Sequence, residues 1–136
     1  MALPNGAGGY QIGDGNLNEV NIGVQAAPPT ATATATLTVA QITGGILLGS
    51  PGSSAAAYTL PTGSSLDSTV SSAKVNSSFD FSVVNVDGSS SGVITMTAGT
   101  GWTIVGLATI AATAGTAGKF RARKTGDGTW TLYRLA

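Results

Sequence analysis

Few residues in this 136-residue chain are able to carry out chemistry. The chain has no histidine and no cysteine, which removes the commonest general base, the usual nucleophile arrangements and the usual zinc ligands. Its acidic residues are Asp14, Glu19, Asp67, Asp80, Asp87 and Asp127. Most of them stand in turn or capping contexts, where aspartate is common. Because this spacing offers no pair of carboxylates for acid-base catalysis, we expect neither an enzyme nor a bound cofactor.

One polar run resembles the beginning of a calcium-binding loop. Asp14, Asn16 and Asn18 follow the spacing of EF-hand ligands. However, Glu19 stands where that loop requires glycine, and Gln25 stands where it requires the bidentate glutamate. We therefore expect an asparagine-rich turn here and no metal site.

Positive charge is concentrated near the C-terminal end. Five of the six basic residues lie there, namely Lys119, Arg121, Arg123, Lys124 and Arg134. Alternating runs on both sides of Asp127-Gly128 predict a β-hairpin, because Asp-Gly favours a tight turn. We expect Asp80, the one acid inside a predicted strand, to pair with an arginine of this hairpin. One basic segment on a neutral chain is a thin footprint for nucleic acid, so the sequence favours a protein partner and no direct nucleic-acid binding.

The faces of this hairpin depend on its register. A two-residue loop would collect core side chains on one face, namely Phe120, Ala122, Tyr133 and Leu135. The opposite face would then carry Lys119, Arg121, Arg123, Trp130, Leu132 and Arg134. A loop of about three or five residues would instead place Tyr133 and Leu135 beside the arginines. In both cases we expect the arginines to share one face.

The N-terminal part differs in composition from the rest. Residues 1–29 are rich in glycine and predict an extended arm, whereas residues 30–136 predict a β-rich body. Within the arm, Glu19–Gln25 alternates strictly and predicts a short strand that must pair with another sheet edge. Thr30–Val39 alternates threonine with small apolar residues, which fits either an extended strand or a flexible linker.

The body is predicted to contain short strands with one or two short helices. A capping box at Thr38 and Gln41, followed by Gly44, predicts one helical turn, and a second short helix is expected from Ser64 to about Ala73. Strands are expected at Ile46–Leu48, Ala56–Leu60, Ser78–Val86, Gly92–Ala98, Trp102–Val105 and Ala108–Thr113. Turn signals every 8–12 residues or so predict an all-β fold, a β-sandwich or jelly-roll-like body. The longest apolar run, Trp102–Ala112, is too short to span a bilayer, so we expect no membrane partner.

Four segments carry a resemblance to a known family. They are MALPNGAGGYQIGDGNLNEV, TATATATLT, SSFDFSVVNVDGSSSGVITMTAGTGWTIVG and FRARKTGDGTWTLYRL. Together they resemble capsid decoration (cement) proteins of cyanophage-like tailed bacteriophages. The resemblance implies a homotrimer that binds the major capsid protein at three-fold positions on the outer surface of the virion and stabilises the capsid. Its motifs are not chemically specific, so it transfers no binding residues.

Candidate contacts therefore come from the pattern of this chain alone. The arm is expected to contact the capsid or a neighbour through Tyr10, Ile12, Leu17, Val20, Ile22 and Val24. Trimer or partner contacts are expected at Thr32, Thr34, Thr36, Asp80, Arg121, Arg123, Trp130 and Arg134. One alternative is a receptor- or glycan-binding fibre module that uses Trp102, Trp130 and Tyr58. Another is a minor tail or neck structural protein.

Overall fold

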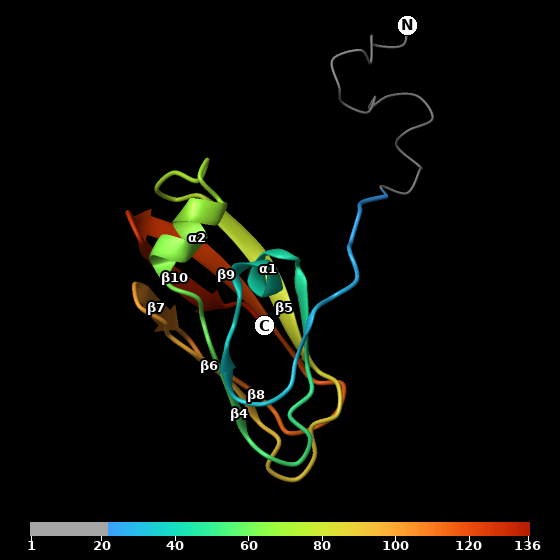
Figure 1. Cartoon of the computed structure of the whole chain (residues 1–136). Helices are drawn as coiled ribbons and strands as arrows, with labels where there is room; N and C mark the ends of the chain where they lie inside the picture. The colour runs from blue at the N-terminus through green and yellow to red at the C-terminus, as the bar shows by residue number, and fades with distance from the viewer. Residues whose placement is uncertain (1–21) are drawn as a thin grey trace, which may run out of the picture.

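A computed structural model describes residues 22–136, which fold into two sheets and two short helices (Figure 1). The large sheet has six strands in the order β1 (Thr30–Ala31), β3 (Ile46–Gly49), β5 (Ser78–Asn85), β9 (Ala117–Gly126), β10 (Thr129–Arg134) and β7 (Trp102–Val105). The small sheet has four, in the order β2 (Ala35–Thr36), β4 (Ala56–Thr59), β6 (Ile94–Thr97) and β8 (Thr109–Ile110). The helices are α1 (Val39–Thr43) and α2 (Gly63–Thr69). Within residues 22–136, no helix is long and apolar enough to cross a membrane.

The strands of both sheets are partly parallel, so the expectation of an all-β sandwich or jelly roll is wrong. In the large sheet β1, β3 and β5 run parallel, and in the small sheet β2, β4 and β6 do the same. Antiparallel pairs join β5 to β9, β9 to β10, and β6 to β8. The protein is therefore a mixed α/β fold.

The path of the chain explains this parallel order. The turn at Pro51-Gly52 leads from β3 in the large sheet to β4 in the small sheet, and Asp87-Gly88 likewise leads from β5 to β6. Helix α1 lies between β2 and β3, and helix α2 lies between β4 and β5. Each helix therefore carries the chain from the small sheet back to the large one. Parallel neighbours require such crossovers. The turn signals at Pro51-Gly52 and Asp87-Gly88 are real turns, but these two turns connect different sheets instead of forming hairpins.

Both helices begin at local capping signals. The N–H of Gln41 donates to Thr38 Oγ1 and the N–H of Thr38 donates to Gln41 Oε1, which confirms the capping box. The left-handed glycine after α1 is Gly45, with φ of +90°, and not Gly44. Helix α2 begins at Gly63 after the N-cap Thr62 and ends at Thr69, so it is shorter than expected.

The threonine-alanine segment is not one long strand. It bends between β1 and β2, and so passes from an edge of the large sheet to an edge of the small sheet. The hydroxyl of Thr34 accepts the N–H of Ala57 at 3.0 Å and fixes this bend. Ala31 and Leu37 are buried on either side of it. Tertiary contacts with β3 and β4 thus decide its shape.

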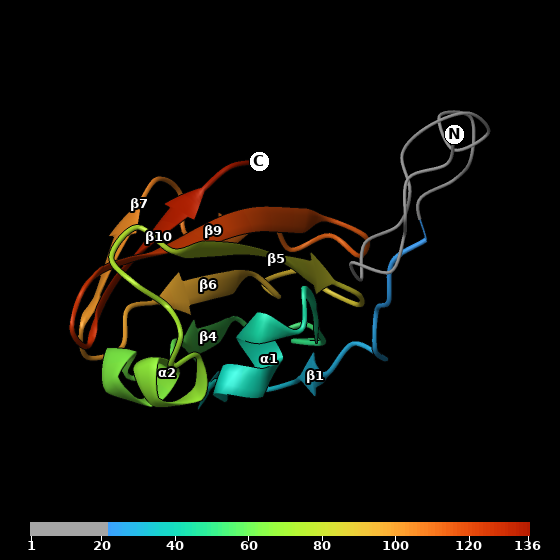
Figure 2. The ribbon, with the colours of Figure 1, turned by 90° about the horizontal axis from the view of Figure 1, so that it is seen from above.

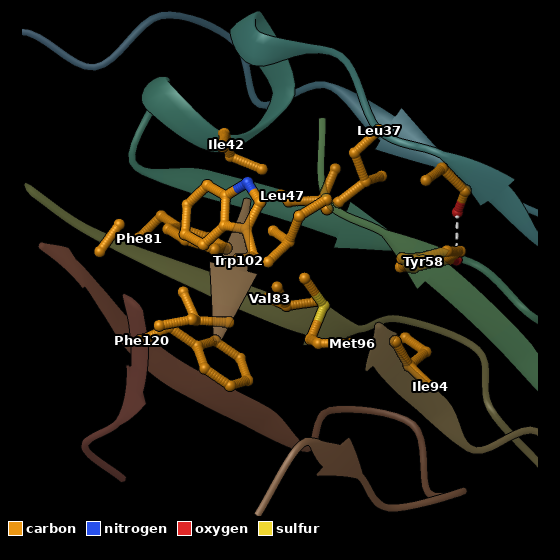
Figure 3. Close-up of a cluster of buried hydrophobic side chains, with 14 of the residues drawn as sticks. Leu37, Ile42, Leu47, Tyr58, Phe81, Val83, Ile94, Met96, Trp102 and Phe120 are labelled. Carbon is orange, nitrogen blue, oxygen red and sulfur yellow. Dashed lines mark hydrogen bonds between the residues drawn. The ribbon is translucent and has the colours of Figure 1, made fainter. Parts of the chain in front are cut away.

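The core fills the space between the sheets (Figure 3). Its largest aliphatic and aromatic members include Leu47, Phe81, Met96, Phe120 and Leu132, and helices α1 and α2 add Ile42 and Leu66. Burial of one such side chain stabilises the fold by about 1.5–3 kcal/mol. Tyr58 is also buried, and its hydroxyl donates to the carbonyl of Ala31 at 2.7 Å. Burial raises the pKa of the Tyr58 phenol.

Candidate interaction surface

The hairpin formed by β9 and β10 contains an irregular step next to its turn. Gly126 pairs with Thr129 around a two-residue loop, as expected for Asp127-Gly128. The register then shifts, so that Trp130 pairs with Lys124 and Thr125 is left over as a β-bulge. An extra residue in one strand reverses which side chains point to each face beyond it.

This bulge overturns the face assignment based on a regular two-residue loop. Trp130 and Leu132 join Phe120 and Ala122 in the core, whereas Tyr133 lies beside Arg121. The alternative with Tyr133 on the arginine face is therefore correct, although a bulge produces it and not a longer loop. Trp130 is 1% exposed, so the core and not a partner surrounds it.

The side of the large sheet that points away from the small sheet is called the outer face below. Across it Asp80 of β5 pairs in register with Arg121 of β9, which pairs with Tyr133 of β10. Arg121 holds Asp80 by two hydrogen bonds, from Nε to Oδ1 at 2.6 Å and from Nη2 to Oδ2 at 2.9 Å. Lys119 Nζ lies 4.0 Å from Asp80 Oδ2. The predicted pairing of Asp80 with a hairpin arginine is confirmed.

Arg123 makes a second polar contact group on the outer face. Its Nε and Nη2 donate to the hydroxyl of Tyr133 at 3.0 and 2.8 Å, and its Nη1 donates to Asn76 Oδ1 at 2.8 Å. Three cations, Lys119, Arg121 and Arg123, stand against the single acid Asp80, which leaves 3 − 1 = +2 on this face. The outer face therefore favours a partner that presents acidic groups or carbonyl oxygens.

Arg134 does not share the face of the other two arginines, so that expectation is wrong. It pairs with Phe120, and its guanidinium carbon lies 5.2 Å from the centre of the Phe120 ring. Its Nη1 donates to the carbonyls of Thr109 at 2.8 Å and Leu107 at 3.3 Å. Arg134 thus fastens β10 to the connection between β7 and β8.

A third charged group lies on the inner side of the hairpin, against α2. Asp67 Oδ1 accepts from Trp130 Nε1 at 2.9 Å and pairs with Lys124 Nζ at 3.0 Å, while its Oδ2 accepts the N–H of Gly128 at 2.6 Å. The sequence indicated Asp67 only as a capping residue. Its link to Lys124 had no local signal, because the two residues meet only in the tertiary structure.

Three of the four aspartate side chains in residues 22–136, those of Asp67, Asp80 and Asp87, are occupied as structural acceptors. Hydrogen bonds from Arg121 lower the pKa of Asp80, and hydrogen bonds from Ser50 and Gly52 lower the pKa of Asp87. Burial alone raises the pKa of Asp67, but hydrogen bonds from Gly128, Lys124 and Trp130 outweigh it, and the net pKa is lowered. A general acid needs a raised pKa, so these three groups are suited to holding structure. Among residues 22–136, no three His, Cys, Asp or Glu side chains gather as a metal site would require.

The candidate arm contacts are only partly described. Tyr10, Ile12, Leu17 and Val20 lie outside residues 22–136. Ile22 and Val24 belong to an extended segment that leads away from the body (Figure 1), and their side chains are 91% and 101% exposed. Gln25 fastens this segment to the body, because its Nε2 donates to the carbonyl of Gly44 at 2.7 Å. Within the described part of the chain, Ile22–Val24 is not paired with a strand.

The predicted threonine contacts are exposed, whereas the aromatic residues of the glycan-binding alternative are buried. Thr32, Thr34 and Thr36 are all exposed along the bend between β1 and β2. By contrast, Trp102, Trp130 and Tyr58 are at most 8% exposed, so they offer no stacking surface for a sugar. An open depression beside Phe79 and Trp130 has a volume of about 230 Å³, which is below the range of about 300–1,000 Å³ typical of ligand pockets.

Some surface residues were not assigned a contact role from the sequence. Asn76 and Tyr133 complete the Arg123 group, and Val105, Leu107 and Leu135 lie exposed at one corner of the large sheet. The only available sequence signal for this corner was the absence of any charge between residues 88 and 118. No family description, curated protein or solved structure matches this chain. The candidate surface is therefore defined by its geometry alone.

Proposed function

We propose that this protein is a structural virion protein that decorates and stabilises the outside of a tailed-phage capsid as a homotrimer. The observation that carries the proposal is the segment Ile22–Val24, whose apolar side chains stand almost fully exposed beyond the Gln25 contact. An apolar extended segment next to a folded body is suited to adding a strand to a partner's sheet.

Two further features support a role in assembly. The chain carries no net charge and only 9% charged residues, whereas a dispersed single protein usually relies on many surface charges. The outer face of the large sheet adds a net positive surface whose central pairs are already fixed by Asp80 and Tyr133. In this proposal the capsid protein, other copies of this chain, or both cover these surfaces.

The mechanism is mechanical. A trimer placed where several capsid subunits meet adds contact area across their boundaries and so opposes the outward pressure of packaged DNA. Closed three-fold symmetry matches the symmetry of such a position. Thr32, Thr34 and Thr36 are assigned to the trimer contacts because they are exposed and uncharged.

The experiment is a binding assay with intact shells. The full-length protein is mixed with expanded capsids of the phage that encodes it, bound protein is separated by sedimentation, and its position is determined by electron microscopy. We expect many copies per shell, located at three-fold positions. A few copies at one vertex would indicate a neck or tail component, and no bound protein at saturating concentration would refute the proposal.

A further inference from the structure

The two edges of the large sheet are protected to different degrees. At the β1 edge, the outward carbonyl of Thr30 accepts from Gln41 Nε2 at 3.1 Å, so a side chain already blocks it. At the opposite edge, β7 has four residues, whereas β2 and β8, the edges of the small sheet, have two each. The β7 edge is thus the longest open strand edge in the described part of the chain.

The hydrogen bonding of β7 shows which of its groups are free. The N–H of Trp130 donates to the carbonyl of Gly101 at 2.9 Å, so Gly101, Thr103 and Val105 direct their backbone groups toward β10. Alternate residues of a strand point to opposite neighbours, and Ile104 therefore turns its N–H and C=O to the open side. Exposed edges are usually guarded by charges, proline or bulges, but residues 88–118 contain no charged side chain.

Apolar side chains gather beside this open edge. Val105, Leu107 and Leu135 are 50%, 67% and 45% exposed. They lie close together because Val105 pairs with Tyr133, and Arg134, next to Leu135, donates to the carbonyl of Leu107. A strand added along β7 would cover Val105 on the outer face.

The segment Ile22–Val24 has the complementary properties. In an extended strand Ile22 and Val24 point to the same side, since side chains alternate, and Gly23 between them has no side chain to obstruct the other side. This segment is also uncharged. Within residues 22–136, neither the backbone of this segment nor the open side of β7 is paired with a strand, so each can supply the hydrogen-bond donors and acceptors that the other needs.

The β7 edge of the same chain cannot be the partner of this segment. The segment leaves the body beside β1, and β7 lies at the other edge of the six-stranded sheet, on the opposite side of the body (Figure 2). Five strand spacings separate these edges by roughly 24 Å. Because Gln25 is fastened to Gly44, Ile22 reaches only about 10 Å beyond that point. The β7 edge of the same chain is out of reach.

We propose that Ile22–Val24 of one copy adds as a strand to the β7 edge of another copy, with Ile22 and Val24 packed against Val105 and Leu107. The contact is head-to-tail, because each copy supplies its segment to one neighbour and its β7 edge to another. Such a contact closes into a ring when its rotation allows. The inference names the contact within the assembly proposed above, but it concerns the isolated protein and holds or fails without the capsid.

The test uses the absence of native cysteine in this chain. Val24→Cys protein is mixed with Val105→Cys protein, and the two are cross-linked with a short bis-maleimide. In the matched control, Val75→Cys protein takes the place of Val105→Cys protein. Val75 is also exposed, but it lies on the loop before β5. We expect about tenfold more cross-linked dimer than in the control, because docking raises the local concentration. Equal yields in the two mixtures would refute the proposal. So would cross-linking within single chains of a Val24→Cys, Val105→Cys double variant.

A second measurement tests the same contact without a cross-linker. The mass of the unmodified protein in solution is compared with that of Val105→Lys and Val75→Lys by light scattering, after matching unfolding curves show that both variants fold. We expect Val105→Lys to have a lower mass in solution than the unmodified protein, and Val75→Lys to have the same mass as the unmodified protein. A wild-type protein that stays monomeric at every accessible concentration would overturn the inference, whereas failure to bind shells by a protein that still cross-links would refute only the capsid proposal.

Discussion

Two ion pairs on opposite faces of β9 show how strongly location changes the same chemistry. Lys124 of β9 pairs with Asp67 of α2, their side chains are 10% and 20% exposed, and Asp67 also accepts from Trp130 and Gly128. Arg121 and Asp80 lie on the outer face with side chains 49% and 32% exposed. Solvent screens the outer pair, while removal of one inner partner leaves a charge without compensation. We infer that the inner pair holds the body together and the outer pair shapes its surface.

The largest effect is expected from Asp67→Ala. This change leaves the Lys124 ammonium nearly buried without its partner and removes the acceptor of Trp130 Nε1. We expect a loss of about 3–5 kcal/mol in the free energy of unfolding, measured with urea. Asp67→Asn, which keeps the shape and one of the two acceptor oxygens but not the charge, serves as the control and should lose less. A loss below about 1 kcal/mol for Asp67→Ala would place the inner pair in the same class as exposed pairs.

A somewhat smaller loss is expected from Gly63→Ala at the start of α2. A Cβ at this position would lie 2.0 Å from the carbonyl oxygen of Gly128, so α2 and the hairpin turn would have to separate. We expect a loss of about 1–3 kcal/mol, although Gly→Ala in a helix ordinarily stabilises by roughly 0.5–1 kcal/mol. Thermal unfolding of Gly63→Ala shows whether the change in stability is a loss or a gain, and Ser68→Ala, at an exposed position of α2, serves as the control. Stabilisation by Gly63→Ala would show that the contact between α2 and the turn is loose.

Acid is expected to weaken the fold by protonating the carboxylates of both ion pairs and that of Asp87. Asp67, Asp80 and Asp87 have pKa values lowered in the folded state, so the folded state binds fewer protons than the unfolded chain. Their contribution is complete above the unfolded pKa of about 3.9 and is lost as pH falls through the folded values. Urea midpoints should be nearly constant from about pH 7 to 5 and fall below about pH 4. In Asp67→Asn the urea midpoint should decrease less steeply as the pH falls below about 4. The same pH dependence as in the unmodified protein would exclude Asp67 as a main contributor.

The smallest effect is expected from Arg121→Ala on the outer face. The pair that it removes is solvent-exposed, and such pairs contribute little because water and salt screen them. The unfolding midpoint should therefore shift far less than with Asp67→Ala, and the shift should shrink further at high salt. A shift as large as that of Asp67→Ala, and independent of salt, would contradict the proposed difference between the two pairs.

The hairpin illustrates how far local reasoning reaches. The turn at Asp127-Gly128 and the pairing of Asp80 with a hairpin arginine were predictable, because they follow from turn preference and strand alternation. The bulge at Thr125 was not predictable, since no residue type marks it. One unmarked residue was enough to move Trp130 and Leu132 into the core and Tyr133 to the outer face. Face assignments in a hairpin thus depend on the packing of its whole sheet.

The same limit applies to the fold class and to the candidate surface. Most strand positions in the body and the glycine turns could be inferred from alternation and composition, whereas the strand predicted over Glu19–Gln25 is absent from its described residues, 22–25. The parallel order of the strands could not, because a turn signal does not state whether the next strand joins the same sheet or the other one. The open β7 edge follows from that order and was equally hidden.

The sequence by itself determined the features held by neighbours in the chain. These are the capping box of Thr38 and Gln41, the Asp127-Gly128 turn and the concentration of cations near the end. Their hydrogen bonds and charges span a few residues, so they form with little dependence on the rest. Only the tertiary structure decided the sheet order, the hairpin register and the meeting of Asp67 with Lys124. Those features join segments that are far apart in the sequence, and the packing of the common core selects among their possible pairings.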